Sequence, residues 1–256
     1  LELAATSSII QKNQKISAKP GTESKHDKLL QIYVTKLNAY LCIFVDEGLG
    51  GAANNSQLQK SVCCITDEFS AVSCLETIKQ GFEVKLLICY ETREDVIHLV
   101  KIMDKILPRL LRSEVELEFH KISKFGKKSD DILSKNSLIT DILINSAKEK
   151  KISHISLTTS PLIFPSTYVE TLQRRVFGAG MIPHISLSGI DSEIMKNARE
   201  IGMEKYVSKI EKLLRTNFIK SKPKLNKKEK TTKKIIKVRL GPNNVHTILD
   251  SLEIEH

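Results

Sequence analysis

The chain has 256 residues, with 40 Lys and Arg against 30 Asp and Glu, a net charge of +10, and 41% hydrophobic residues. This length and apolar fraction are enough for one or two domains with a buried core, which excludes a wholly disordered or fibrous chain. No apolar run approaches the ~18 residues of a membrane span, and the first residues lack the pattern of a secretory signal. We therefore expect a cytoplasmic protein without a membrane partner.

The positive charge is concentrated in one segment. Residues 215–239 contain eleven cationic side chains and one acid, so this stretch has the net charge of the whole chain and the remainder is neutral. A flexible polycation gains affinity for nucleic acid by releasing condensed counterions. RNA, and tRNA in particular, is the predicted partner, and the alternative is a solvated linker. The predicted nucleic-acid-binding residues are Lys220, Lys222, Lys224, Lys227, Lys228, Lys230, Lys233 and Lys234.

The five cysteines are odd in number and lie in or beside apolar stretches: Cys42, Cys63, Cys64, Cys74 and Cys89. None has the spacing of a zinc ligand pair. We expect reduced core thiols and no metal site.

Hydrophobic periodicity divides the chain into elements. Residues 1–30 are polar and predict a flexible arm, with a weak helix near its end. Short apolar or β-branched runs between turn residues then predict strands over 60–65, 84–89, 115–122, 152–157 and 184–187. Patterns of 3.6-residue period predict helices over 68–80, 92–107, 130–149, 166–177, 191–201 and 206–217.

This alternation predicts an α/β domain over 31–215. Its nearly all-apolar strands favour a five-stranded, mostly parallel sheet with helices on both faces, and a ligand site at the carboxyl ends of the strands. Residues 216–256 form the third part, a Lys-rich extension followed by a short strand over 235–240 and a helix over 245–252.

Three segments in the same order resemble the tRNA 4-thiouridine synthetases, sulfurtransferases that are also tied to thiamine biosynthesis. They are residues 39–51 with the run 61–65, then the turn and helix over 65–84, and finally 160–172 with 182–202. The resemblance covers roughly residues 39–210. It implies a PP-loop, adenine nucleotide α-hydrolase-like fold, tRNA modification, and ATP or AMP as the cofactor. Residues 1–30 are too short and polar for the family's THUMP-type RNA-binding domain.

The phosphate-binding turn departs from the family's SGGxDS motif. Thr66 and Asp67 replace both glycines, Phe69 replaces the aspartate, and Ser70 alone is retained. Backbone N–H groups close on a pyrophosphate in such a turn, but Asp67 and Glu68 would oppose it electrostatically. The alternative interpretation is an ordinary helix start capped by Thr66.

The chain also lacks the residues that the family's sulfur chemistry requires. Asn136 and Ile139 stand where the resemblance places a cysteine pair that would carry a persulfide. Leu162 and Ile163 replace the Gly and Gln of the family's third segment. These losses indicate a degenerate member without the intact motif, so no catalytic residue is assigned.

Two functions remain open. The first is a non-catalytic homologue that acts as a nucleotide- or RNA-associated binding protein. The second is an active ATP-dependent tRNA-thiolation or adenylation enzyme whose partner supplies sulfur. A homodimer is compatible with either. The residues that the resemblance places around a nucleotide are Thr66, Ser70, Cys89, Tyr90, Thr158 and Ser160.

Overall fold

A computed structural model describes most of the chain. The described residues are 2–16, 19–20, 31–36, 38–42, 52, 55–110, 112–125, 129–189, 192–199, 202 and 231–254. The chain divides into two compact units, Leu1–Gly48 and Leu49–His256, whose placement relative to one another is not determined. The division falls after Gly48 instead of the expected residue 30.

The first unit contains a helix and a strand pair. Helix α1 (Glu2–Lys12) is followed by the 3₁₀ turn η1 (Gln14–Ile16), and strands β1 (Gln31–Val34) and β2 (Ala39–Cys42) pair antiparallel. The Thr35 hydroxyl accepts a 3.0 Å hydrogen bond from the Asn38 N–H, which closes the turn between these strands. A helix that the sequence did not predict therefore lies at the start of the polar arm, and the weak helix predicted near its end falls outside the described residues.

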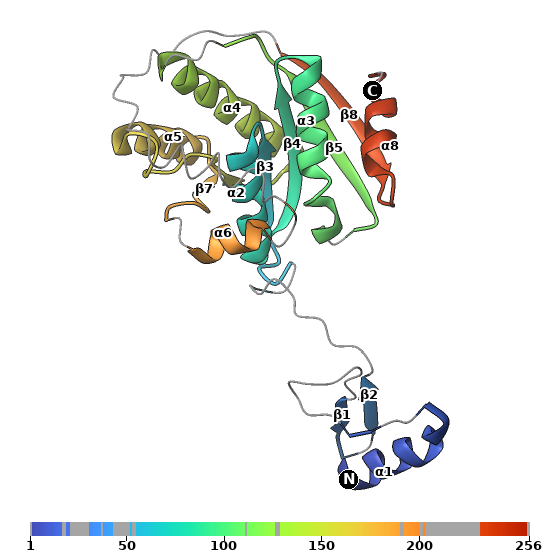
Figure 1. Cartoon of the computed structure of the whole chain (residues 1–256). Helices are drawn as coiled ribbons and strands as arrows, with labels where there is room; N and C mark the ends of the chain where they lie inside the picture. Colours follow the sequence, from blue (N-terminus) through green and yellow to red (C-terminus); the bar gives the residue numbers. More distant parts are fainter. Residues whose placement is uncertain are drawn as a thin grey trace. The chain divides into compact units, whose positions relative to one another are not determined.

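The second unit is built on one mostly parallel sheet (Figure 1). Its strand order is β7-β6-β3-β4-β5-β8, and β8 alone runs antiparallel to its neighbour. The strands are β3 (Lys60–Ile65), β4 (Glu83–Tyr90), β5 (Glu114–Lys121), β6 (His154–Ser156), β7 (Ile182–His184) and β8 (Thr232–Arg239).

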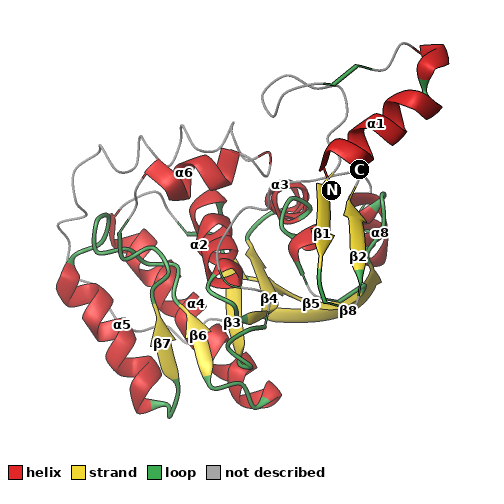
Figure 2. Ribbon diagram, turned by 90° about the horizontal axis from the view of Figure 1, so that it is seen from below, coloured by secondary structure: helices red, strands yellow, loops and turns green. Residues whose placement is uncertain are grey.

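Helices cover both faces of this sheet, as predicted. Helices α2, α3, α6 and α8 lie on one face, and α4 and α5 lie on the other (Figure 2). In the described residues, no helix is both long and apolar enough to cross a membrane. The helices are α2 (Glu68–Lys79), α3 (Arg93–Met103), α4 (Ser129–Lys150), α5 (Ser166–Gly178), α6 (Ser192–Ala198) and α8 (Asn244–Ser251), with the 3₁₀ turn η2 (Leu107–Arg109).

The central strand β3 explains why the core forms two layers. Its residues 61–65 are all buried. Successive side chains of a strand point to opposite faces, so Cys63 and Ile65 join the cluster under α2 and α3, whereas Val62 and Cys64 join the cluster under α4 and α5. An apolar run without alternation is therefore the pattern of a strand covered on both sides.

The sheet has six strands and not the predicted five, because β8 joins it. Residues 232–239 pair with β5 along its whole length, from Glu114–Arg239 to Lys121–Thr232. Ile236 and Val238 enter the core under α3, and α8 packs Ile248 and Leu249 against the same cluster. The C-terminal strand and helix thus complete the α/β fold and are not an extension beside it.

Two predicted strands are shorter or shifted in the structure. β6 covers only His154–Ser156, and β7 is Ile182–His184 instead of 184–187. Pro183 lies within β7, which is tolerated because β7 is an edge strand with a ladder partner on one side only. The predicted helix over 206–217 lies outside the described residues.

A matched pair of neighbouring isoleucines tests whether β8 belongs to the core. Ile236 is 7% exposed and Ile235 is 46% exposed. We expect Ile236→Ala to lower the free energy of unfolding by about 2–4 kcal/mol, because it leaves a cavity, and Ile235→Ala to lower it by less than about 1 kcal/mol. Urea unfolding of both variants measures this, and an equally small loss in both would contradict the core assignment.

Candidate functional site

The sheet order places a topological switch point between β3 and β6. The chain proceeds from β3 through β4 to β5 on one side, and then crosses to β6 and β7 on the other. In open α/β sheets, ligands bind at such a point, outside the carboxyl ends of the strands. The segments that end there are Thr66 and Asp67 after β3 and residues 157–160 after β6. This edge is the candidate site.

The turn after β3 is closed by its own side chains. The Ser70 hydroxyl accepts hydrogen bonds from the backbone N–H groups of Thr66 (2.8 Å) and Asp67 (3.0 Å). A carboxylate oxygen of Asp67 in turn accepts the Ser70 N–H at 2.8 Å. Two backbone donors of the turn before α2 and one in its first turn are therefore occupied, and backbone N–H groups in such a turn are the kind that bind phosphate.

This arrangement corrects the predicted N-cap residue of α2. Asp67, and not Thr66, is the N-cap residue of α2, and together with Ser70 it forms a reciprocal capping box. The adjacent Glu68 carboxylate lies 3.0 Å from the His98 imidazole of α3. The entrance thus presents an exposed Asp67 carboxylate beside Glu68, which opposes a polyphosphate.

The loop after β6 contributes hydroxyl groups, most of them buried. Thr158 is partly exposed, whereas Thr159 and Ser160 are 2% and 0% exposed. The Ser160 hydroxyl accepts the Leu162 N–H at 3.2 Å, so it stabilises its own loop. The Thr159 hydroxyl has no hydrogen-bond partner among the described residues. Sequence reasoning missed this group, and no local pattern identifies it.

A buried hydroxyl cluster fastens α2 to the strands beyond the switch point. The Ser73 and Ser186 hydroxyls lie 2.6 Å apart, and those of Thr77 and Ser156 lie 2.9 Å apart. All four side chains are buried. Buried polar groups that satisfy one another fix the packing of the elements that hold them, so α2 is held in place over β6 and the segment after β7.

The structure separates the two predicted site residues of β4. Cys89 is 1% exposed and belongs to the core under α4, where its sulfur lies 3.4 Å from that of Cys64. Burial, reinforced by this contact, raises the pKa of the Cys64 thiol well above its ordinary value. Cys89 therefore lies in the core and is not presented at the surface of the candidate site. Tyr90 ends β4 and is partly exposed, and burial raises the pKa of its phenol.

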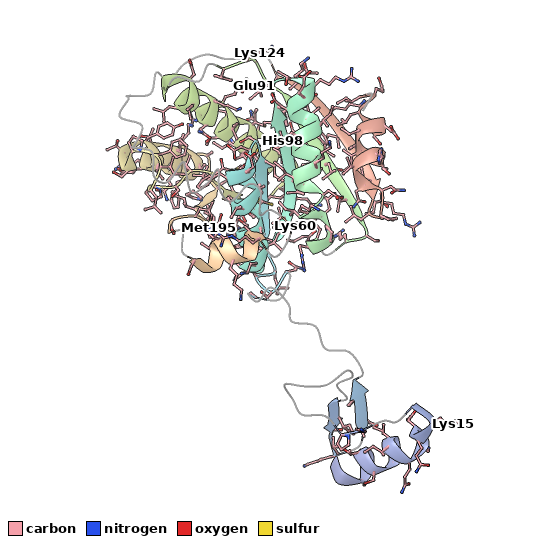
Figure 3. The ribbon with its side chains drawn as sticks, viewed as in Figure 1. Lys15, Lys60, Glu91, His98, Lys124 and Met195 are labelled. Atoms are coloured by element: carbon pink, nitrogen blue, oxygen red, sulfur yellow. The ribbon has the colours of Figure 1, made fainter. Side chains whose placement is uncertain are left out.

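Glu91 follows β4 directly, at the carboxyl edge of the sheet, and connects this edge to α4. Its carboxylate accepts the Phe125 N–H at 3.0 Å and lies 2.6 Å from the Lys135 ammonium of α4. Figure 3 shows Glu91 with Lys124 at this edge, and Lys60 at the opposite one. The Glu91 carboxylate is thus already paired with a cation of the chain itself, Lys135.

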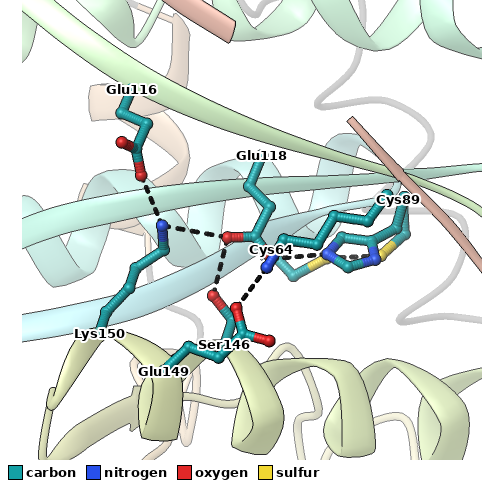
Figure 4. A network of polar contacts seen from close by, with 9 residues as sticks. Cys64, Cys89, Glu116, Glu118, Ser146, Glu149 and Lys150 are labelled. Atoms are coloured by element: carbon teal, nitrogen blue, oxygen red, sulfur yellow. Dashed lines mark hydrogen bonds and ion pairs between the residues drawn. The ribbon is translucent and has the colours of Figure 1, made fainter. Parts of the chain in front are cut away.

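A buried carboxylate organises the side of the sheet beneath α4 (Figure 4). The Glu118 side chain, 2% exposed, lies 2.7 Å from the His120 imidazole and 3.2 Å from each of the Lys150 and Lys233 ammonium groups. Ser146 donates a further hydrogen bond of 3.0 Å. Burial alone would raise the pKa of Glu118, but the surrounding donors lower it to about 2.

The structure places two of the predicted RNA-binding lysines, both on β8. Lys233 pairs with Glu118 and Glu149, and Lys234 lies 3.3 Å from Glu253. The other predicted lysines, from Lys220 to Lys230, lie outside the described residues. Lys233 is 30% exposed and held by two carboxylates, so its charge is neutralised within the fold.

The rest of β8 faces a row of acids. Glu114 and Glu116 of β5 lie directly opposite Arg239 and Lys237. Opposite charges at paired positions stabilise neighbouring strands, and the pKa of Glu116 is lowered by Lys150, with a smaller contribution from Lys237. Four of the eleven cations of residues 215–239 therefore belong to a strand whose neighbour is acidic.

The described residues contain no cluster of three or more His, Cys, Asp or Glu side chains that could hold a metal ion. The buried cysteines of the second unit, Cys63, Cys64, Cys74 and Cys89, are free thiols.

Comparisons with known proteins agree with the fold. No family model and no curated protein matches the sequence. A crystal structure of a 4-thiouridine synthetase–RNA complex with bound ATP is similar, with a TM-score of 0.52 and 17% identity over 78% of this chain and 54% of that one. A crystal structure of PH1313 from Pyrococcus horikoshii OT3 has a TM-score of 0.48 and 15% identity, over 71% and 53%.

The chain spans about half the length of each of these two structures. At this identity, the likeness to the synthetase shows the fold alone. The protein is thus of the mostly parallel α/β class that this synthetase also has, with its candidate site at the β3–β6 switch point.

The buried and exposed ion pairs of β8 allow a matched test. We expect Glu118→Gln to lower the free energy of unfolding by about 3 kcal/mol at pH 7, because it removes the buried charge on which His120, Ser146, Lys150 and Lys233 converge. Glu253→Gln removes the partner of Lys234; because the Glu253 side chain is 88% exposed, the change should lower the free energy of unfolding by less than about 1 kcal/mol.

The pH dependence gives a second readout for the same variant. The pKa of Glu118 in the folded state, about 2, lies below the ordinary 4.5. Its contribution to stability is therefore present above pH ~4.5 and lost as pH falls toward ~2. The difference in free energy of unfolding between wild type and Glu118→Gln, measured by urea unfolding, should decrease over this pH range. A difference that does not change with pH, or that equals the effect of Glu253→Gln at pH 7, would contradict a stabilising role for the Glu118 network.

Proposed function

We propose that the chain is a non-catalytic homologue of the 4-thiouridine synthetases that acts as an RNA-associated binding protein. The observation that carries this proposal is the closed start of α2. Three backbone N–H groups that could bind phosphate are hydrogen-bonded to Asp67 and Ser70. A polyphosphate would have to break the capping box, which is worth about 1 kcal/mol, and then lie against the Asp67 carboxylate.

The positions expected for a sulfur-carrying cysteine pair support the same conclusion. Asn136 and Ile139 lie inside helix α4, where the Asn136 side chain donates to the Ile132 carbonyl at 3.1 Å and Ile139 is 2% exposed. Both side chains serve the packing of α4. Neither has the thiol that persulfide transfer requires.

The RNA part of the proposal rests on charge. Seven of the eleven cations in residues 215–239 precede β8 in the sequence and lie outside the described residues. A short segment of this density gains affinity from counterion release. The similar synthetase structure is itself an RNA complex, which makes RNA the polyanion to test first.

Calorimetry with ATP, ADP and AMP tests the loss of the phosphate site. We expect no binding below about 1 mM, because the N–H donors are occupied and two carboxylates oppose the phosphates. Asp67→Asn retains a capping side chain but removes the charge, and serves as the matched control for the electrostatic part. Micromolar ATP binding by the wild type that Ser70→Ala weakens would instead support the adenylating enzyme.

Gel shifts with tRNA at several salt concentrations test the basic segment. The triple change Lys222→Gln, Lys224→Gln and Lys227→Gln should weaken binding and lower the salt slope by about 2–3, because each phosphate that a lysine neutralises adds ~0.7–0.9 to the slope. The control is a triple Lys→Gln variant with the same change of charge at the exposed residues Lys101, Lys121 and Lys148. It should retain most of the salt slope. Equal reductions of the slope in the two triples would refute a localised contact.

A further inference from the structure

The strand β8 forms one edge of the six-stranded sheet (Figure 2). It has eight residues, Thr232–Arg239, and it pairs with β5 along one side. In the part of the chain that the structure describes, no strand lies on its other side. An edge strand presents a row of backbone N–H and C=O groups that can pair with another chain, so the outer side of β8 is a candidate interaction surface.

The register with β5 determines which backbone groups of β8 point outward. Opposite residues of an antiparallel pair alternate between hydrogen-bonded and non-hydrogen-bonded positions. Leu240 is a hydrogen-bonded position, because it continues this register and its N–H donates to the Ser113 carbonyl at 2.7 Å. Every second residue back from Leu240 therefore points its backbone groups to β5. The outward residues, whose N–H and C=O groups point away from β5, are Lys233, Ile235, Lys237 and Arg239.

The side chains of the outward residues lie on one face of the sheet. Ile236 and Val238 are buried under α3 on the other face, and successive side chains of a strand alternate between faces. The outward residues thus share the α4 side, where Lys233 contacts Glu149 of that helix. A strand added to this edge would place its own side chains on that face beside three cations and Ile235, which is 46% exposed.

Two of these three cations form no ion pair within the described residues. Lys233 is already neutralised by two carboxylates. Lys237 lies opposite Glu116, whose carboxylate instead lies 2.5 Å from the Lys150 ammonium. Lys237 and Arg239 are both exposed, and neither has a carboxylate within ion-pair distance among the described residues. The outer edge therefore offers two uncommitted positive charges, two residues apart on the same face.

We propose that the outer edge of β8 binds an extended acidic segment of a partner protein, which adds to the sheet as an antiparallel strand. The backbone of this segment pairs with the outward residues, and its acidic side chains lie at alternate positions beside Lys237 and Arg239. β5 has this pattern on the inner side, where Glu116 and Glu114 lie directly opposite the same two cations. The surface uses none of the lysines that precede β8, so it does not depend on the proposed RNA function.

The charges and the backbone groups disfavour two other occupants. A second copy of β8, paired antiparallel along its whole length, would set Lys233 opposite Arg239, and like charges at opposite positions destabilise a strand pair. RNA phosphates accept hydrogen bonds but donate none, so they would leave the outward C=O groups without partners. A peptide backbone supplies both donors and acceptors at the spacing of a strand.

An NMR titration of the full chain with the capped peptide TEVEVEVET tests this surface. In the free chain, the amides of residues 234, 236 and 238 should be protected from hydrogen exchange, and those of residues 233, 235, 237 and 239 should exchange rapidly. The peptide should slow exchange at the second set, because their N–H groups become hydrogen-bonded. The peptide TKVKVKVKT, with the opposite charge, is the control and should not bind.

Methylation of the peptide backbone tests strand pairing on the wild-type chain. In an antiparallel pair, the glutamates that lie beside the outward residues also point their N–H groups at β8. N-methylation of the central glutamate should therefore abolish binding, whereas N-methylation of the neighbouring valine, whose N–H points away, should be tolerated. Equal loss with both peptides, or equal binding of both, would contradict pairing at this edge.

A double variant tests the charges. Lys237→Gln with Arg239→Gln should weaken peptide binding about tenfold, because two cross-strand ion pairs are lost. Lys101→Gln with Lys148→Gln makes the same change of charge at exposed positions of α3 and α4, and should leave binding within about twofold of the wild type. The proposal is overturned if the acidic peptide causes no change at residues 233–239, if the basic peptide binds equally, or if the two double variants weaken binding equally. A uridine oligonucleotide that slows the same four amides, when the peptide does not, would assign the edge to RNA instead.

Discussion

The buried carboxylate of Glu118 is the constraint on which the edge of this fold depends. An ionised group at 2% exposure is tolerated only when several donors surround it, and here the donors come from three elements. Lys150 and Ser146 come from α4, Lys233 comes from β8, and His120 comes from β5 itself. Satisfying one charge therefore ties α4 and β8 to the same strand.

This constraint changes the meaning of the basic segment. In the sequence, residues 215–239 form one continuous cationic run. In the structure, its last part is the strand β8, which lies against Glu114, Glu116 and Glu118 of β5 and pairs with Glu253 near the C-terminus. The polycation is thus two features: a structural strand with acidic partners, and the lysines before it that we propose for RNA.

Periodicity and capping patterns predicted the layers of the fold but not its edges. The apolar run over 60–65 and the 3.6-residue periodicity over 92–107 are local signals, and the structure confirms the strand β3 and the helix α3 that they predict. β8 was predicted as a separate strand, because only tertiary pairing shows that its lysines have acidic partners. Cys89 shows a related limit: alternation along β4 assigns it to one face of the sheet, but only the tertiary structure shows that this face is covered by α4 and α5.

For the candidate site, too, the sequence predicted the local features and the structure added the tertiary ones. The sequence identified the turn after β3 and the Thr66 and Asp67 that replace its glycines, and the structure added which atoms close it. A Ser at position 70 is compatible with a phosphate loop or with a capping box. The alternatives differ only in whether Asp67 faces the Ser70 N–H, as it does here at 2.8 Å. Sequence alone cannot decide this, because both arrangements use the same residue types.

The most direct test of the closed turn is amide hydrogen exchange at Thr66, Asp67 and Ser70. We predict that all three amides are protected in the free chain, and that saturating Mg²⁺ and ATP leaves their exchange rates unchanged. Rapid exchange in the free chain that ATP slows selectively at these three residues would show an open phosphate-binding turn, and would contradict the central claim.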